Sequence, residues 1–173
     1  MDFRDVTKSA MEEYREALNR AVNGLTPVEL YHQPAPSSNH IAWLAWHIAR
    51  VEDSWVNRYL AGKEQIWVAG HWYERLGLAA DNGGARNTVE DVAAFPKIEM
   101  SEIQAYHAAV RETAMPVVDG LSAADLAVSY DERKGWRPVA PTVTWVLGHL
   151  VVEESQHVGQ IAYIRGMLRG LGN

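Results

Sequence analysis

Hydrophobic residues recur every three or four positions over most of this chain, which is the spacing of amphipathic α-helices. The pattern covers four long segments, which we predict to be helices: Asp2–Asn23, His40–Leu60, Ser101–Val118 and Thr142–Arg169. The first segment presents an apolar face made of Phe3, Val6, Met11, Tyr14, Leu18 and Val22. A glycine follows closely after each of the four segments and provides a natural stop.

Local signals refine the ends of these helices. Thr26 and Glu29 have the spacing of a capping box, with a proline between them, and this predicts a short helix after the first long one. Ser101 and Gln104 have the same spacing at the start of the third long segment. Pro116 lies near the end of that segment, and we expect it to kink or shorten the helix.

The connection between the second and third long helices is unusually long. Residues 63–97 contain several glycines and aromatic residues, and we predict a crossover with one short helix, Val89–Phe95. The sequence Asn82-Gly83-Gly84 marks a turn there, without the strand and helix that flank a phosphate-binding loop. A structureless connection of this length is unusual unless it is functional.

Together these elements predict an all-α fold, a four-helix bundle with a long crossover between the second and third helices. We find no internal repeat and no convincing strand pattern. The 173 residues suggest one domain spanning 1–173. A chain of this size buries roughly 70% of its unfolded surface, so it needs no disulfide or metal to fold.

Composition narrows the chemistry. The chain has no cysteine, which excludes disulfides, thiolate metal sites and a cysteine nucleophile. Its net charge of −6, with no basic run, argues against nucleic acid as a partner. No secretory signal is visible, and no apolar run approaches the roughly 20 residues of a membrane span. We therefore expect a cytoplasmic protein that binds a small molecule and does not bind a membrane.

Three polar residues interrupt the apolar stripes of two predicted helices. His47 lies among Leu44, Ile48 and Val51, and Glu153 and His157 lie between Leu150 and Ile161. An unpaired buried carboxylate costs several kcal/mol or more. A divalent metal shared by Glu153 and the two imidazoles would remove that cost.

The spacing of these residues fits a shared ligand. Glu153 and His157 are one turn apart and point about 40° from each other, so their side chains can converge. His149 lies a further turn back, about 80° from His157, and is a poorer ligand that can line the site. Two neutral imidazoles and one carboxylate form a catalytic ligand set for zinc, and the same set suits iron, nickel or manganese.

Each of these residues also has a simpler interpretation. His47 can be a hydrogen-bonded core histidine, and Glu153 with His157 can be a side-chain pair on one helix. His40 lies at a helix start and can cap it or form a pocket wall. Trp72 and Tyr73 can wall a pocket or cover the bundle end. The remaining histidines, His32, His71 and His107, are expected at the surface or in loops.

Two stretches resemble the DinB-like superfamily. Residues 149–161, HLVVEESQHVGQI, resemble its last-helix signature, in which a histidine, a metal ligand and a ligating histidine follow one another at four-residue steps. The signature continues with Arg-Gly-Gln, of which Gly159 and Gln160 are present and Val158 replaces the arginine. Residues 38–49, SNHIAWLAWHIA, resemble the helix that supplies the remaining ligand, here His47. Many members have histidine at the position of Glu153, whereas those resembling mycothiol-dependent maleylpyruvate isomerase have glutamate.

This resemblance implies a four-helix bundle that binds a divalent ion, often nickel or zinc, and frequently forms a homodimer. It also implies thiol-dependent transferase or isomerase chemistry, in which an external thiol such as mycothiol or bacillithiol binds the metal. The absence of cysteine fits an external thiol. We therefore expect a metal-dependent S-transferase or isomerase for a low-molecular-weight thiol. The alternatives are a metal-dependent hydrolase and a non-catalytic metal-binding protein of a stress response, and a closed coordination shell would favour the last of these.

Overall fold

The computed structural model describes residues 2–133 and 138–170, and these residues form helices and turns without a β-strand. A single isolated bridge joins Ser129 to Thr142. The predicted all-α class is confirmed. None of the described helices combines the length and the apolar character that a membrane span requires.

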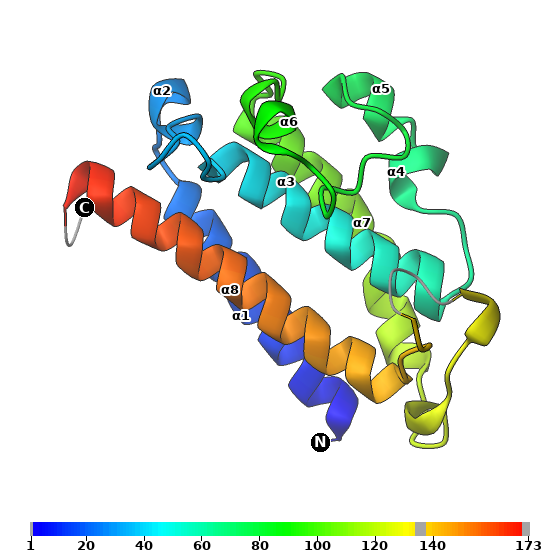
Figure 1. The fold of residues 1–173 in the computed structure, drawn as a ribbon. Coiled ribbons are helices and arrows are strands. Elements are labelled where there is room, and N and C mark those ends of the chain that lie inside the picture. The colour runs from blue at the N-terminus through cyan, green and yellow to red at the C-terminus, as the bar shows by residue number, and fades with distance from the viewer. Residues whose placement is uncertain (1, 134–137, 171–173) are drawn as a thin grey trace.

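Four long helical segments pack around a common core (Figure 1). They are α1 (Phe3–Val22), α3 (Ile41–Glu52) with its continuation η1 (Asp53–Leu60), α7 (Met100–Gly120) and α8 (Val143–Arg169). The helix α1 packs against α7 and α8, and α3 packs against the same two helices. Shorter elements lie between them: α2 (Pro27–Leu30), α4 (Ile66–Ala69), α5 (Trp72–Leu76), α6 (Val89–Ala93), η2 (Asp125–Ala127) and η3 (Asp131–Arg133).

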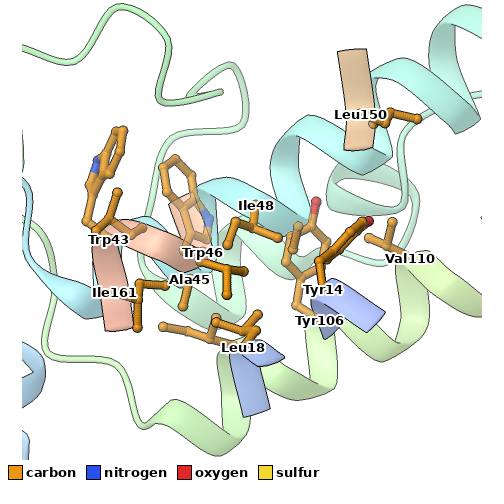
Figure 2. Close-up of a cluster of buried hydrophobic side chains, with 14 of the residues drawn as sticks. Tyr14, Leu18, Trp43, Ala45, Trp46, Ile48, Tyr106, Val110, Leu150 and Ile161 are labelled. Atoms are coloured by element: carbon orange, nitrogen blue, oxygen red, sulfur yellow. The ribbon is translucent and has the colours of Figure 1, made fainter. Parts of the chain in front are cut away.

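Large apolar side chains from all four segments fill the core. Figure 2 shows Trp46 and Ile48 of α3 lying near Tyr14 of α1 and Tyr106 of α7, with Leu150 contributed by α8. The helix α3 is buried on every side from Ile41 to Arg50. A helix that is surrounded by protein has little freedom to shift, so the side chains that it carries are held in place.

Three predictions concern the ends of the helices, and two of them are wrong. The capping box of Thr26 and Glu29 is confirmed at the start of α2. The box expected at Ser101 is wrong, because α7 starts one residue earlier, after Glu99, and has no side-chain cap. The expected shortening at Pro116 is also wrong, since α7 continues to Gly120. Buried residues on both sides of Pro116, Ala114 and Val118, keep the helix packed even though a proline removes one backbone donor.

One expected core position lies outside. Val6 was assigned to the inner face of the first helix, but it is 62% exposed, and Thr7 occupies the inward position instead. Adjacent residues on a helix differ by about 100° in direction, so a small error in the phase of the stripe exchanges them.

The second long helix changes type at its centre. Its last eight residues form the π-helix η1, in which the backbone N–H of Ala61 binds the carbonyl of Val56. Asp53, the first residue of η1, accepts hydrogen bonds from the backbone N–H groups of Ile66 and Trp67 at 2.9 and 2.8 Å. Those residues begin α4, so the carboxylate ties the crossover to η1. The π-helix is rare, and the single π-helical turns found inside α-helices frequently lie at functional sites.

The crossover holds more structure than expected. Besides α6, which matches the predicted short helix, it contains α4 and α5. The prediction of a single short helix was therefore wrong. These two elements have four and five residues and no side-chain cap, whereas the equally short α6 begins with a capping box.

A buried polar network joins three helices in the core. Glu52 of α3 accepts hydrogen bonds from the hydroxyl of Tyr14 and from Nε of Arg111, both at 2.7 Å. Nε2 of His107 lies 3.3 Å from the same carboxylate, and Arg111 also donates to the carbonyl of Met11. His107 was expected at the surface, and this was wrong. It is buried because α7 turns this side of the helix toward Glu52, which satisfies its polar ring.

The network keeps a carboxylate charged inside the protein. Burial acts to raise the pKa of Glu52, but His107, Arg111 and Tyr14 outweigh it and hold the pKa well below its usual value. Glu52 is therefore ionised at neutral pH, and Arg111 is its cationic partner. Buried pairs of this kind are sensitive to the loss of either partner.

We predict that Arg111→Met lowers the free energy of unfolding by about 3–5 kcal/mol, because it leaves the Glu52 carboxylate buried without its cation. Urea denaturation followed by circular dichroism measures the change. The double variant Glu52→Gln/Arg111→Met removes both charges and should recover a substantial part of the loss. Equal midpoints for wild type and the single variant would contradict the assignment.

A second prediction concerns His40, which caps α3. Its Nδ1 accepts the backbone N–H of Trp43 at 3.1 Å, and burial lowers the pKa of His40 to about 4, with a smaller contribution from Lys97 and opposition from the backbone of Val92. Between pH 6.5 and 4 the unfolded chain therefore binds more protons at this site than the folded one. Stability should fall as the pH falls through that window, by about 1–2 kcal/mol after allowance for solvent screening.

The control for this prediction is His40→Asn, which keeps a side-chain acceptor at the cap but does not titrate. Thermal melts at pH 7 and pH 4 should show a smaller loss in the variant than in wild type. An identical pH dependence in both proteins would show that His40 is not responsible.

Candidate metal site

His47, Glu153 and His157 come together between α3 and α8. Each offers one ligand atom, and these atoms all lie within 4.8 Å of one another. Oε1 of Glu153 is 3.2 Å from Nε2 of His157 and 4.0 Å from Nε2 of His47. Within the described part of the chain, no other group of three or more histidine, aspartate or glutamate residues has this geometry.

The imidazole rings of His47 and His157 are oriented in the same way relative to Glu153. In both, Nε2 faces Glu153, while Nδ1 faces a second acceptor. For His47 the acceptor is the carbonyl of Gly83 at 3.0 Å, and for His157 it is Oε1 of Gln160 at 2.9 Å. A backbone carbonyl can only accept, so Nδ1 of His47 carries the proton and Nε2 keeps its lone pair. Histidines that bind metals are held in this way by acceptors on their outer nitrogen.

The charges at this point also suit a cation. Burial lowers the pKa of His47 to about 4, and the neighbouring His157 adds to the effect, so His47 is neutral at pH 7. The hydrogen bond with His157 lowers the pKa of Glu153, which is therefore ionised. Burial acts to lower the pKa of His157, but Glu153 and Gln160 outweigh it and raise the value. A carboxylate beside two imidazoles thus attracts positive charge, and the donor set fits a divalent metal.

The expected burial of Glu153 is wrong. Glu153 is half-buried at the edge of the core, whereas its neighbour Glu154 is completely buried. The inward stripe of α8 passes through Leu150, Glu154, Val158 and Ile161, so Glu154 takes the position that we had assigned to Glu153. The cost of a buried charge therefore does not explain Glu153. The case for a metal depends instead on the convergence of three ligand atoms.

Glu154 itself is in an unusual environment. Neither of its carboxyl oxygens has a hydrogen-bond partner among the described residues. Burial, followed by the negative charges of Glu52 and Glu153, raises the pKa of Glu154 well above its usual value. Burial without a hydrogen-bond partner therefore favours the neutral form of Glu154, which avoids the cost of a buried anion.

A cavity of about 750 Å³ opens beside the three ligands. Both His47 and Glu153 line it, so one side of the ligand group faces open space. Other lining residues come from α3 and η1, from the crossover and from α8: Arg50, Val51, Ser54, Trp55, Arg58, Lys63, Glu64, Gln65, Val68, Ala80, Asp81, Gly83, Ala85 and His149. The π-helical turn contributes Ser54, Trp55 and Arg58 to this wall.

The structure places His149 in the cavity wall and outside the ligand group. Its ring stacks on Trp145 with the ring centres 4.4 Å apart and the planes at 19°. It also meets the ring of Trp55 edge-on, with the centres 5.7 Å apart. These contacts fix the plane of the imidazole next to the space where a ligand would lie.

The structure does not place Trp72 and Tyr73 in this cavity. Trp72 packs against Tyr106 of α7, with Arg75 above its ring, and the hydroxyl of Tyr73 donates to Glu74. Because α5 packs on α4 and reaches α7 through the side chains of Trp72 and Arg75, these aromatic residues cover that side of the bundle. His40 also stays away from the ligand group and acts as the cap of α3. The aromatic residue that does line the cavity is Trp55.

The sequence does not reveal the part of the crossover nearest the candidate ligands. Residues 82–84 are predicted as a turn, and the structure adds that the carbonyl of Gly83 contacts His47. Two consecutive glycines indicate that the backbone lies close to another group, but the sequence does not identify that group.

Comparisons with known proteins agree with this picture. The chain is similar to a solved structure, a conserved protein from Enterococcus faecalis, with a TM-score of 0.85 and 23% sequence identity over 98% of this chain and 99% of that chain. At that identity the likeness shows the fold alone. A comparison with curated proteins gave no match. The family model for mycothiol S-transferase matches residues 6–170, nearly the whole chain, and the chain therefore belongs to the mycothiol S-transferase family, a DinB-like family.

Proposed function

We propose that this protein is a divalent-metal-dependent S-transferase that uses a low-molecular-weight thiol. The observation that carries the proposal is the open side of the ligand group, since His47 and Glu153 both line a cavity large enough for a small molecule. A structural metal site is closed by its four protein ligands, whereas a catalytic site keeps a position for water or substrate. The family supports the thiol part of the proposal.

His47, Glu153 and His157 would hold the metal through two neutral imidazoles and one carboxylate. This set cancels one of the two positive charges of a divalent ion, so the ion remains a strong Lewis acid. Nickel and zinc suit these donors best, and iron and manganese are also compatible. When bound, such an ion lowers the pKa of a thiol and supplies a thiolate nucleophile near neutral pH.

The rest of the chain supplies a binding space and no competing nucleophile. It has no cysteine, so the reacting sulfur must belong to the small molecule. The cavity volume of about 750 Å³ is within the range of roughly 300–1,000 Å³ that small-molecule sites occupy. Trp55, Val51 and Val68 give it apolar surface, and charged residues such as Arg58 and Glu64 give it polar surface. Such a lining can hold a thiol and a second substrate side by side.

The first prediction tests the metal. Purified protein should bind about one equivalent of nickel or zinc, and a chelator should lower the melting temperature. The loss corresponds to roughly 3–4 kcal/mol at a few hundred-fold saturation of the site. Glu153→Gln keeps the shape of the side chain but removes its charge, so metal should bind weakly and the chelator should have little effect.

The matched control is Glu154→Gln, one position further along α8. Glu154 lies outside the ligand group, and burial favours its neutral form, so this variant should bind metal as wild type does. Equal metal content in Glu153→Gln and wild type would show that the three residues do not form the site.

The second prediction tests the thiol. Cobalt-substituted protein should develop a thiolate charge-transfer band when it is titrated with mycothiol, bacillithiol or coenzyme A. Binding releases the thiol proton, so it should strengthen as the pH rises toward the pKa of the free thiol. If no thiol changes the spectrum while acetate or phosphate does, thiol transfer is the wrong chemistry, and metal-assisted hydrolysis replaces it.

A further inference from the structure

We infer that the crossover segment Asn82–Asn87 positions His47 for its role as a ligand. The segment would hold the imidazole in one tautomer and one plane, with Nε2 directed at Glu153. This deepens the proposed function by naming residues that position one of its ligands. The tautomer of His47 can nevertheless be measured without any metal, so the inference has a test of its own.

Two contacts fix the ring of His47. At one edge, Nδ1 donates to the carbonyl of Gly83 at 3.0 Å. On one face, the ring stacks on Trp43, with the ring centres 4.7 Å apart and the planes at 17°. The carbonyl selects the tautomer with the proton on Nδ1, and the stacking restricts rotation of the ring. Both effects leave Nε2 facing Glu153, 4.0 Å away.

The segment is in turn tied to the stacking partner. Nε1 of Trp43 donates to Oδ1 of Asn87 at 2.9 Å, and Nδ2 of Asn87 donates to Oδ1 of Asn82 at 3.1 Å. The same oxygen of Asn82 accepts the backbone N–H of Gly84 at 3.0 Å. Asn87 thus connects the indole that stacks on His47 to the turn that holds its Nδ1.

A second hydrogen bond anchors the segment to α3 on the C-terminal side of His47. Nε of Arg50 donates to the carbonyl of Asn82 at 3.1 Å. Arg50 is itself held, because its remaining nitrogens donate to Tyr106 and Gln65. Trp43 and Arg50 lie four residues before and three residues after His47 on α3. The segment is therefore anchored about one helical turn to either side of the ligand, and it cannot slide along α3 without breaking these bonds.

Gly84 shows how closely the segment approaches the ligand. It has a φ of +83°, and a Cβ added to it would overlap Nδ1 of His47 and lie 3.2 Å from Cζ2 of Trp43. A side chain at this position would push the imidazole away from Gly83. The neighbouring Gly83 has no such restriction, since a Cβ there would meet nothing within 4 Å.

The chain offers a control for backbone strain. Gly77, at the end of α5, also has a positive φ, +70°, but a Cβ there would lie 3.9 Å from its nearest neighbour, Cγ of Pro96. Gly77→Ala and Gly84→Ala therefore introduce the same type of strain, and only the second one collides with His47.

The first measurement uses metal-free protein at pH 7. Long-range ¹⁵N–¹H NMR of the histidine rings should show His47 with a protonated Nδ1 and an unprotonated Nε2 in wild type and in Gly77→Ala. In Gly84→Ala and in Asn87→Ala, the signals should shift toward a mixture of tautomers. A purely structural role would lower the stability of these variants without changing the tautomer.

The second measurement is the affinity for nickel or zinc, by competition with a chromophoric chelator. Gly84→Ala and Asn87→Ala should bind roughly 10-fold or more weakly, the effect usual for residues that orient a metal-bound histidine. Gly77→Ala should stay within about twofold of wild type. Asn87→Ala leaves the backbone free of strain, so it provides the test if Gly84→Ala does not fold.

Two results would overturn the inference. One is a wild-type His47 with its proton on Nε2. The other is unchanged tautomer and metal affinity in folded Gly84→Ala or Asn87→Ala. Failure of the proposed function gives a different result. If wild type binds no metal but Nδ1 of His47 is still protonated, the proposed metal site is wrong and the positioning of His47 by the crossover segment is retained.

Discussion

The packing of α3 against α7 and α8 is the constraint on which the rest of this structure depends. The helix α3 is buried on all sides over its first ten residues, so it cannot rotate or slide without opening the core. It carries His47 toward α8, Glu52 toward α1 and α7, and Arg50 toward the crossover. The position of one helix thus decides the geometry of the ligand group, of the buried polar network and of the cavity wall.

Two adjacent glutamates on α8 show how strongly that packing controls chemistry. Glu153 faces the cavity and His157, which keeps its pKa low and leaves it charged. Glu154 faces the core, where burial raises its pKa and favours its neutral form. A rotation of about 100° around the helix separates a candidate metal ligand from a buried acid. The same residue type therefore serves opposite roles, because the environment and not the side chain sets its charge.

The crossover does more than connect two helices, because it contributes groups to the candidate site. It supplies the carbonyl that faces His47, several residues of the cavity wall and, through α4, the backbone groups that bind Asp53. A long connection that was only a linker would have no reason to form these bonds. Its contacts with α3 instead make it part of the rigid frame around the ligands.

The sequence by itself determined the four long helices, their approximate ends and the pairing of Glu153 with His157. These features are local, since they follow from hydrophobic spacing, capping residues and the rise of one turn. The apolar stripe of the second long helix added His47 to the pair, and the resemblance of two short stretches then pointed to the family.

Only the tertiary structure decided which residues face one another across helices. The burial of His107 and Arg111 depends on Glu52, which lies more than fifty residues earlier in the chain. The contact between Gly83 and His47 spans 36 residues of the chain. Neither the glycine turn nor the helical pattern around His47 indicates in the sequence that these two residues meet. The choice of Glu154 over Glu153 for the core depends on the phase of α8 against its neighbours. A periodic pattern gives that phase only to within about one residue, and one residue is a rotation of about 100°.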